Sequence, residues 1–172
     1  MSSQADTGLT AVTVEGGLLS TSVLSSLSRR DGSLSHLTPE SYEVDPGMSL
    51  GEAITRSWNR VLAAWQRFRA EQEDRGSVGA GRTRQILLQV LLEELRFGRP
   101  PRVGGVEVDG THYAISHMWE HVPIHILGPE IPLDRRTEGV AGAAKASPHT
   151  MVQEFLNASE DHLWGILSNG RK

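Results

Sequence analysis

The chain has 172 residues, which suits a single domain, and 38% of them are hydrophobic, enough for a core. Its formal net charge of −4 argues against a protein that coats nucleic acid, but it leaves room for a local basic face that contacts DNA. The absence of cysteine excludes disulfides and thiolate metal sites, and no apolar run has the length of a transmembrane helix.

The N-terminal part favours an irregular arm over residues 1–48. Its first residues, M-S-S-Q-A-D-T, lack the basic start and apolar stretch of a signal peptide, so we expect a cytoplasmic protein. Val12 and Val14 alternate with polar residues, which indicates a short strand, and apolar residues at near-helical spacing predict a helix over 18–27. Residues 33–47 carry two prolines and read as an irregular connection.

The strongest helix signal begins at Ser49, which opens an α+β module expected over residues 49–172. Ser49 and Glu52 have the spacing of a capping box, in which each side chain accepts a hydrogen bond from the other residue's free amide. The helix is predicted to end near Glu73. Its apolar stripe predicts core residues: Ile54, Trp58, Val61, Leu62, Trp65 and Phe68.

A second helix is predicted over residues 82–97, after a glycine-containing joint at 76–81. Leu88 and Leu92 widen its apolar face, so we expect burial on more than one side. Gly98 suits the left-handed position after a helix, and the two prolines that follow prevent its continuation. The residues expected to face inward are Ile86, Leu87, Val90, Leu91 and Leu95.

Strand signals follow the second helix. Asp109-Gly110 lies between apolar residues and predicts a hairpin turn. Residues 122–127 predict a further strand, in which Pro123 has to lie at the start or on an edge because it lacks an amide hydrogen. Residues 129–146 read as a long loop. Helices followed by a small mixed sheet, with one helix packed on it, make an α+β fold.

The last stretch, residues 147–170, combines a helix and a strand. Ser147 suits the N-cap and Pro148 the first helical position, and the residues that follow have one apolar face. Residues 163–167 form an apolar run of strand length, and Asn169-Gly170 is typical of a hairpin turn. Because only Arg171 and Lys172 follow, we expect the sequence to be the front end of a longer protein.

This stretch also carries a resemblance. S-P-H-x-x-V-Q-E-F-L-N followed by L-W-G-I-L-S-N-G resembles the N-terminal region of large adenine-specific DNA methyltransferases of the type IIG and DISARM-like class. These enzymes belong to restriction-modification and phage-defence systems. The resemblance implies double-stranded DNA, a downstream methyltransferase domain and other defence-system subunits as partners, with no membrane contact. It also implies S-adenosylmethionine as the cofactor of the parent protein, with none in this fragment.

Enzymes of this class often carry an N-terminal nuclease of the PD-(D/E)-x-K type, whose carboxylates and lysine hold magnesium beside the cleaved phosphate. Here Pro123 is followed by Ile124 and His125, and the next segment offers only Asp134-x-Arg136. We therefore expect a fold resembling a degenerate restriction-endonuclease-like core, with no catalytic residues. Methyl transfer is not expected from this fragment either, because it has no N-P-P-Y tetrapeptide and no glycine-rich loop after a strand.

Three histidines, His117, His121 and His125, are spaced by four residues. Residues 115–127 read as a strand, on which positions four apart are roughly 13 Å from each other, too far to share one metal ion. We therefore expect structural or hydrogen-bonding histidines and no metal site.

Arginines form the densest basic set on the two long helices. An arginine beside a helix N-terminus is well placed to meet a phosphate with help from free backbone amides. The alternative is a solvated helix face, because acidic residues are interspersed. The predicted DNA-binding residues are Arg56, Arg60, Arg67, Arg82 and Arg84.

The preferred interpretation is a non-catalytic N-terminal module that packs on a methyltransferase domain and helps to hold DNA. Two alternatives stay open: an active magnesium-dependent endonuclease domain, and a protein-interaction domain without DNA contact.

Overall fold

The computed structural model describes residues 14, 19–29, 34, 37–76 and 79–171. The chain divides into two compact units, Met1–Arg56 and Ser57–Lys172. In the first unit, α1 (Thr21–Ser28) confirms the expected early helix, and a 3-10 turn, η1 (Glu40–Tyr42), lies in the irregular connection. The expected strand at Val12 and Val14 falls almost wholly outside the described residues.

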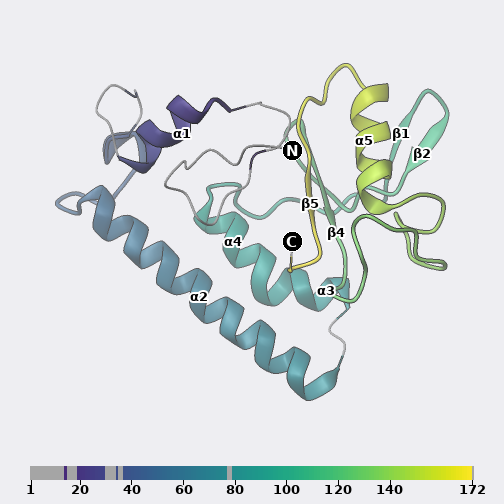
Figure 1. Ribbon diagram of the computed structural model, residues 1–172, viewed down its shortest axis with the longest axis horizontal. Coiled ribbons are helices and arrows are strands. Elements are labelled where there is room, and N and C mark those ends of the chain that lie inside the picture. Colours follow the sequence, from purple (N-terminus) through teal and green to yellow (C-terminus); the bar gives the residue numbers. More distant parts are fainter. Residues whose placement is uncertain (1–13, 15–18, 30–33, 35–36, 77–78, 172) are drawn as a thin grey trace. The chain divides into compact units, whose positions relative to one another are not determined.

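The long helix α2 (Leu50–Arg75) starts in the first unit and continues through the second (Figure 1). Its predicted capping box is present: the amide of Ser49 donates to Glu52 Oε2 over 2.8 Å, and the amide of Glu52 donates to Ser49 Oγ over 3.2 Å. Two otherwise free amides are satisfied in this way, which fixes where the helix begins.

The predicted second helix is interrupted by a π-helical turn. It consists of α3 (Ala80–Thr83), the π-helical segment η2 (Arg84–Leu88) and α4 (Gln89–Glu94). Leu87, Leu88 and Leu92 are buried, which confirms burial on more than one side. The helix ends with a left-handed Arg96 at φ 67°, and the amide of Phe97 donates to the carbonyl of Leu92 over 2.9 Å. The residue that closes the helix is therefore Arg96, and Gly98, also left-handed, lies two positions further on.

A three-stranded mixed sheet lies at the centre of the second unit, in the order β3 (His117–Trp119), β4 (Val122–Ile126), β5 (Ile166–Ser168). β3 and β4 are antiparallel, whereas β4 and β5 are parallel. Pro123 pairs only with Met118 of β3, and the pairing of β4 with β5 starts at Ile124. Pro123 is thus at the start of its strand, as predicted.

A separate hairpin joins β1 (Val106–Val108) to β2 (Thr111–Tyr113). Asp109 and Gly110 both have positive φ, 48° and 73°, as a two-residue turn of this kind requires, so the predicted turn is confirmed. Tyr113 packs edge-on against Phe155 of α5 (Pro148–Ala158), with ring centroids 5.4 Å apart.

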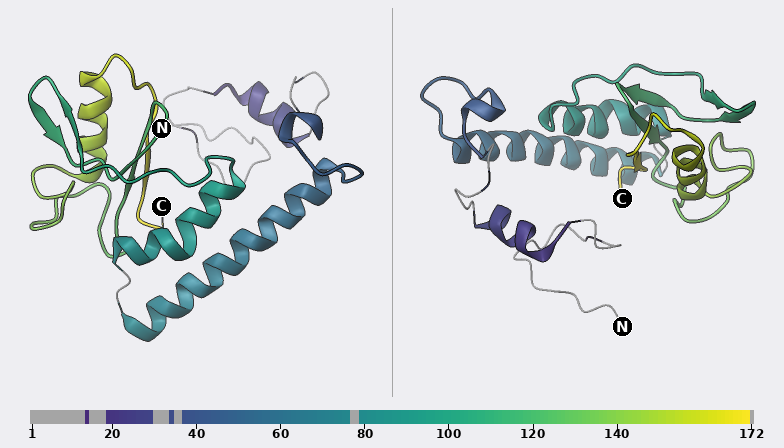
Figure 2. Two further views of the ribbon diagram at one scale, coloured as in Figure 1. Left: turned by 180° about the vertical axis from the view of Figure 1, so that it is seen from behind. Right: turned by 90° about the horizontal axis from the view of Figure 1, so that it is seen from above.

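Helices cover both faces of the mixed sheet. On one face, Ile124 and Ile126 pack with Phe68 of α2 and with Leu87 and Leu88. On the other face, α5 contributes a separate cluster of Met151, Val152 and Phe155, against which Leu167 of β5 packs. β4 and β5 accordingly run between α3–α4 and α5 (Figure 1), and α2 lies beside α4 in both views of Figure 2. The predicted α+β class is confirmed.

Four residues predicted to be in the core are exposed instead. Trp58 is 64% and Leu95 57% exposed, and Ile54 and Leu62 are exposed as well, at 49% and 36%, whereas Phe68 is 0% exposed. The reason is the length of the partner: the segment 80–94 runs alongside only part of α2, and Glu94 at its end pairs with Arg60. The apolar stripe of α2 before Arg60 therefore has no helix opposite it in this unit, although Trp65 and Leu91 are packed against the core as expected.

The predicted hairpin turn at Asn169-Gly170 is wrong. Only Gly170 has positive φ, and the side-chain amide of Asn169 donates to the carbonyl of Ile131 over 2.8 Å. A Cβ on Gly170 would lie 2.7 Å from Thr83 Cγ2 and 3.0 Å from Phe68 Cζ. After β5 the chain thus packs closely onto α2 and α3. β5 also begins later than the predicted strand 163–167: Leu163 and Trp164 precede β5 and are exposed.

Candidate nucleic-acid interface

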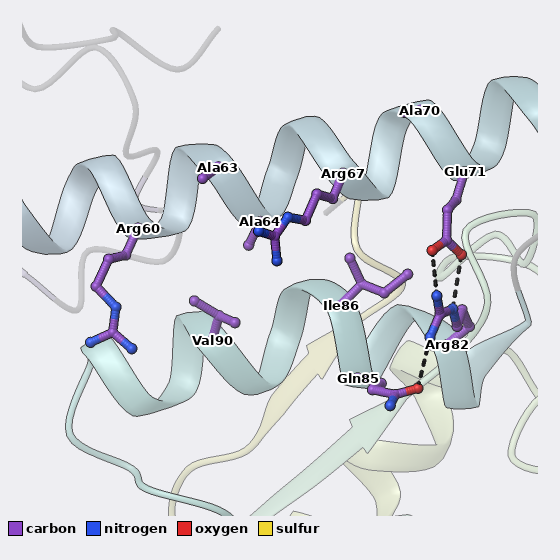
Figure 3. Close-up of a pocket in the computed structure, with 10 residues that line it drawn as sticks. All are labelled: Arg60, Ala63, Ala64, Arg67, Ala70, Glu71, Arg82, Gln85, Ile86 and Val90. Carbon is purple, nitrogen blue, oxygen red and sulfur yellow. Dashed lines mark hydrogen bonds and ion pairs between the residues drawn. The ribbon is translucent and has the colours of Figure 1, made fainter.

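A cleft of about 690 Å³ lies between α2 and the segment formed by α3, η2 and α4 (Figure 3). Its floor is aliphatic and its walls carry charge. Three of the five predicted DNA-binding arginines line it, two from α2 and one from α3. The lining residues are Arg60, Ala63, Ala64, Arg67, Ala70, Glu71, Arg82, Gln85, Ile86 and Val90.

Helical phase explains which arginines reach the cleft. Arg60 and Arg67 are seven residues apart, close to two full turns, so their side chains leave α2 on the same face. Both point toward α4 (Figure 3). Small residues between them, Ala63 and Ala64, leave the space that the arginines border.

Arg82 is held by a carboxylate across the cleft. Its Nε donates to Glu71 Oε2 over 2.8 Å and its Nη2 donates to Glu71 Oε1, which makes the two-bond geometry that favours guanidinium–carboxylate pairs. Its Nη1 donates to Gln85 Oε1 over 3.0 Å. The hydrogen bonds from Arg82 to Glu71 raise the pKa of Arg82. The charge of Arg82 is thus largely balanced within the protein.

The other two arginines of the cleft differ in their partners. Arg60 forms an ion pair with Glu94, whose side chain is only 11% exposed while that of Arg60 is 60% exposed. Arg67 has neither an ion pair nor a hydrogen bond to any residue that the structure describes. Arg67 is therefore the cleft cation that is free to meet an external anion, and Arg60 can do so by leaving Glu94.

The remaining two predicted arginines lie elsewhere. Arg56 pairs with Asp45 within the first unit, with Nη1 2.9 Å from Oδ2. Arg84 follows Arg82 by two residues, which turns a helical side chain by about 200°. Instead of lining the cleft, its charge acts on His117 of β3. The sequence grouped Arg82 and Arg84, but the two side chains serve opposite sides of one helical segment.

Sequence reasoning missed the carboxylates of this cleft. Glu71 is one of the interspersed acidic residues that favour a solvated helix face, and nothing in the sequence pattern distinguishes Glu94. A periodic pattern shows that both lie on helices, but it does not show which helix packs against which. The ion pairs between α2 and the segment 80–94 follow only from the antiparallel packing of these two parts of the chain.

The predicted nuclease positions do not form one site. Pro123 and His125 are buried in β4, whereas the side chain of Asp134 is 81% exposed and Arg136 is exposed in the loop that follows. In the described part of the chain, no group of three or more histidine, aspartate or glutamate side chains is arranged to hold a metal ion.

The histidines are on a hairpin, not on one extended strand as predicted. His117 lies on β3 opposite Ile124 of β4, so it is close to His125 in the sheet, although the alternation of side chains along β4 places His125 on the other face. Both rings are at most 4% exposed. Burial lowers the pKa of His125 to about 4, and burial together with Arg84 and Arg102 lowers the pKa of His117 to about 4.

In comparisons with protein-family models, with curated proteins and with solved structures, no match to this chain was found. Among the described residues, no helix combines the length and the apolar character that crossing a membrane requires.

Proposed function

We propose that the second unit binds the phosphate backbone of double-stranded DNA through the cleft between α2 and α4. In this proposal it is the non-catalytic N-terminal module of a cytoplasmic, adenine-specific DNA methyltransferase of a restriction-modification or phage-defence system. The single observation that carries DNA contact is the convergence of Arg60, Arg67 and Arg82 on one cleft, with Arg67 unpaired in the described chain.

The chemistry of the cleft suits phosphate better than a base edge. Guanidinium groups form paired hydrogen bonds with phosphate oxygens, and contacts of this kind set the position of a protein on DNA without reading its sequence. The aliphatic residues of the cleft offer no donor or acceptor for a base. The module would accordingly add affinity, while sequence recognition and methyl transfer belong to the rest of the parent enzyme with its S-adenosylmethionine.

The stretch that resembles methyltransferases is part of the core of the unit. Residues 147–170 build α5 and β5, and Phe155 is 0% exposed. We also propose that the mixed sheet between helical layers is a nuclease-like core whose degenerate positions, Pro123, His125, Asp134 and Arg136, no longer come together in one site. Such a core would act as a scaffold for the basic cleft and for packing on the methyltransferase domain.

Replacing Arg67 with glutamine should weaken binding to duplex DNA, because one phosphate contact is lost. We expect the slope of log K against log salt concentration to become shallower by about 1. Fluorescence anisotropy of a labelled duplex over a series of salt concentrations measures this slope.

Arg69→Gln is the matched control, since it removes one charge from the same helix. Arg69 is not a lining residue of the cleft and pairs with Glu73 over 3.1 Å. It should leave the slope nearly unchanged. Equal effects of the two substitutions would mean that only net charge matters, and the absence of any salt-dependent binding would favour a protein-interaction domain.

Replacing Glu71 with glutamine should strengthen DNA binding. The substitution keeps the side-chain shape but removes the charge that holds Arg82, so the cleft gains one net positive charge. An exposed ion pair contributes little to stability, so releasing Arg82 should raise the affinity by a few-fold at most. The same anisotropy assay tests it, and weaker binding by Glu71→Gln would show that the pair is needed to position Arg82.

A further inference from the structure

A second basic cluster lies at the mixed sheet, apart from the residues that line the cleft. It brings together Arg84 from η2, Arg102 from the segment before β1, and His117 from β3. Arg102 forms an isolated antiparallel bridge with His117, and residues opposite each other in such a pair point to the same face. The charges of both arginines act on His117, as does His125 of β4.

The cluster has no counter-ion in the described chain. Neither Arg84 nor Arg102 makes an ion pair or a side-chain hydrogen bond with a described residue, and the groups whose charges disfavour protonation of His117 are Arg84, Arg102 and His125. Arg84 is half-buried. A partly desolvated guanidinium without an acceptor is costly, so its surroundings favour an anion supplied from outside the chain.

One ring nitrogen of His117 has a hydrogen-bond partner in the described chain and the other has none. Its Nδ1 lies 2.8 Å from Ser116 Oγ, and this hydroxyl donates to the carbonyl of Ile124 over 3.0 Å. Since a hydroxyl has only one proton, Ser116 has to accept from Nδ1–H. The same arrangement suits both the neutral and the protonated ring. The Nε2 atom is buried without a partner, and protonation would turn it into a donor.

We propose that Arg84, Arg102 and His117 form a binding site for one phosphate group. The two guanidiniums hold the phosphate, and His117, after taking up a proton, donates to it from Nε2. Because Nε2 has no exposed surface, binding also requires a local side-chain movement that brings a phosphate oxygen to it. The phosphate belongs either to a nucleic-acid backbone or to a small phosphomonoester. The site does not depend on DNA binding in the α2–α4 cleft.

The test is NMR titration of the His117 ring in the full chain, with and without inorganic phosphate. Phosphate should raise the pKa of His117 by about 1 or more, because an anion offsets the two guanidinium charges. Arg84→Gln and Arg102→Gln should each weaken phosphate binding by about tenfold or more. Circular dichroism confirms that the two variants are folded.

Arg69→Gln and Arg136→Gln are the controls, since each removes a cation outside this cluster and outside the α2–α4 cleft, and should leave the response to phosphate intact. Two further probes separate the two sources of phosphate: adenosine monophosphate, and a DNA duplex that has no terminal phosphates. If the site binds backbone phosphate, the duplex raises the pKa of His117. If the site binds a phosphomonoester, only the nucleotide raises it. The proposal is overturned if the pKa of His117 is unchanged by all three probes, or if Arg84→Gln and Arg102→Gln respond like the parent chain.

Discussion

Replacing Phe68 with alanine should lower the free energy of unfolding by about 3–5 kcal/mol, the usual cost of emptying a buried aromatic site. Phe68 is 0% exposed and lies in the cluster that joins α2, η2 and the mixed sheet. Its ring is 5.7 Å from that of Trp65, and its Cζ is the atom that a Cβ on Gly170 would approach to 3.0 Å. The substitution therefore opens a cavity where three parts of the unit meet.

Trp58→Ala is the matched control on the same helix. Trp58 belongs to the same sequence stripe but is 64% exposed, so its removal should cost less than about 1 kcal/mol. Urea unfolding followed by circular dichroism compares the two variants without relying on tryptophan emission. A larger loss for Trp58→Ala than for Phe68→Ala would show that the exposed half of the stripe is covered in solution.

Acidification should destabilise the fold between pH 6.5 and about 4, through His117 and His125. Both have a pKa lowered from 6.5 to about 4 in the folded chain. Between these values the unfolded chain binds protons that the folded chain does not, so stability falls as pH falls. Above pH 6.5 both histidines are neutral in the folded and in the unfolded chain, so the effect vanishes. For each histidine whose pKa is about 4 in the folded chain, the loss in the free energy of unfolding approaches about 3 kcal/mol near pH 4.

Urea midpoints measured from pH 7.5 to 4.5 test this expectation. The range stays largely above the region in which Glu52 and Glu93 lose their stabilising contribution; hydrogen bonds that Ser49 donates to Glu52 and that Arg99 donates to Glu93 lower the pKa values of these carboxyl groups. His125→Leu should flatten the dependence on pH, whereas His149→Gln, on the exposed side of α5, should not. A midpoint that is constant over this range would show that the two buried rings titrate normally.

If phosphate binds at His117, phosphate binding and the acid destabilisation of the fold are linked. A bound phosphate favours the protonated ring, so phosphate should reduce the acid destabilisation that His117 contributes while leaving that of His125 unchanged. Repeating the urea series in phosphate and in a buffer without phosphate at equal ionic strength separates the two histidines.

Local signals were sufficient for several elements. Ser49 and Glu52 start α2, Ser147 and Pro148 start α5, and Asp109-Gly110 closes the β1–β2 hairpin. In each case the hydrogen bonds or dihedral angles involve residues within a few positions of one another. Such features depend little on the rest of the chain, so they can be predicted from the order of residues alone.

The candidate sites were predictable only in part. The sequence placed arginines on two helices, but the Glu71–Arg82 and Arg60–Glu94 pairs depend on how those helices pack. Likewise, His117 and His125 lie close together in the sheet because the chain reverses between β3 and β4, and the residues at that reversal carry no strong turn signal. Positive φ at Glu120, 48°, shows that the turn is made by a residue that does not ordinarily favour this conformation.

The sequence by itself therefore determined where the helices α2 and α5 begin, the β1–β2 turn and the α+β class, because these follow from capping, turn geometry and periodicity. Only the tertiary structure decided which half of the α2 stripe is buried, where Asn169-Gly170 packs, and which charges meet. Those outcomes depend on the length of the segment 80–94 beside α2 and on contacts between residues far apart in the chain. Burial and charge pairing are properties of the packed molecule, whereas a helix start is a property of a few neighbouring residues.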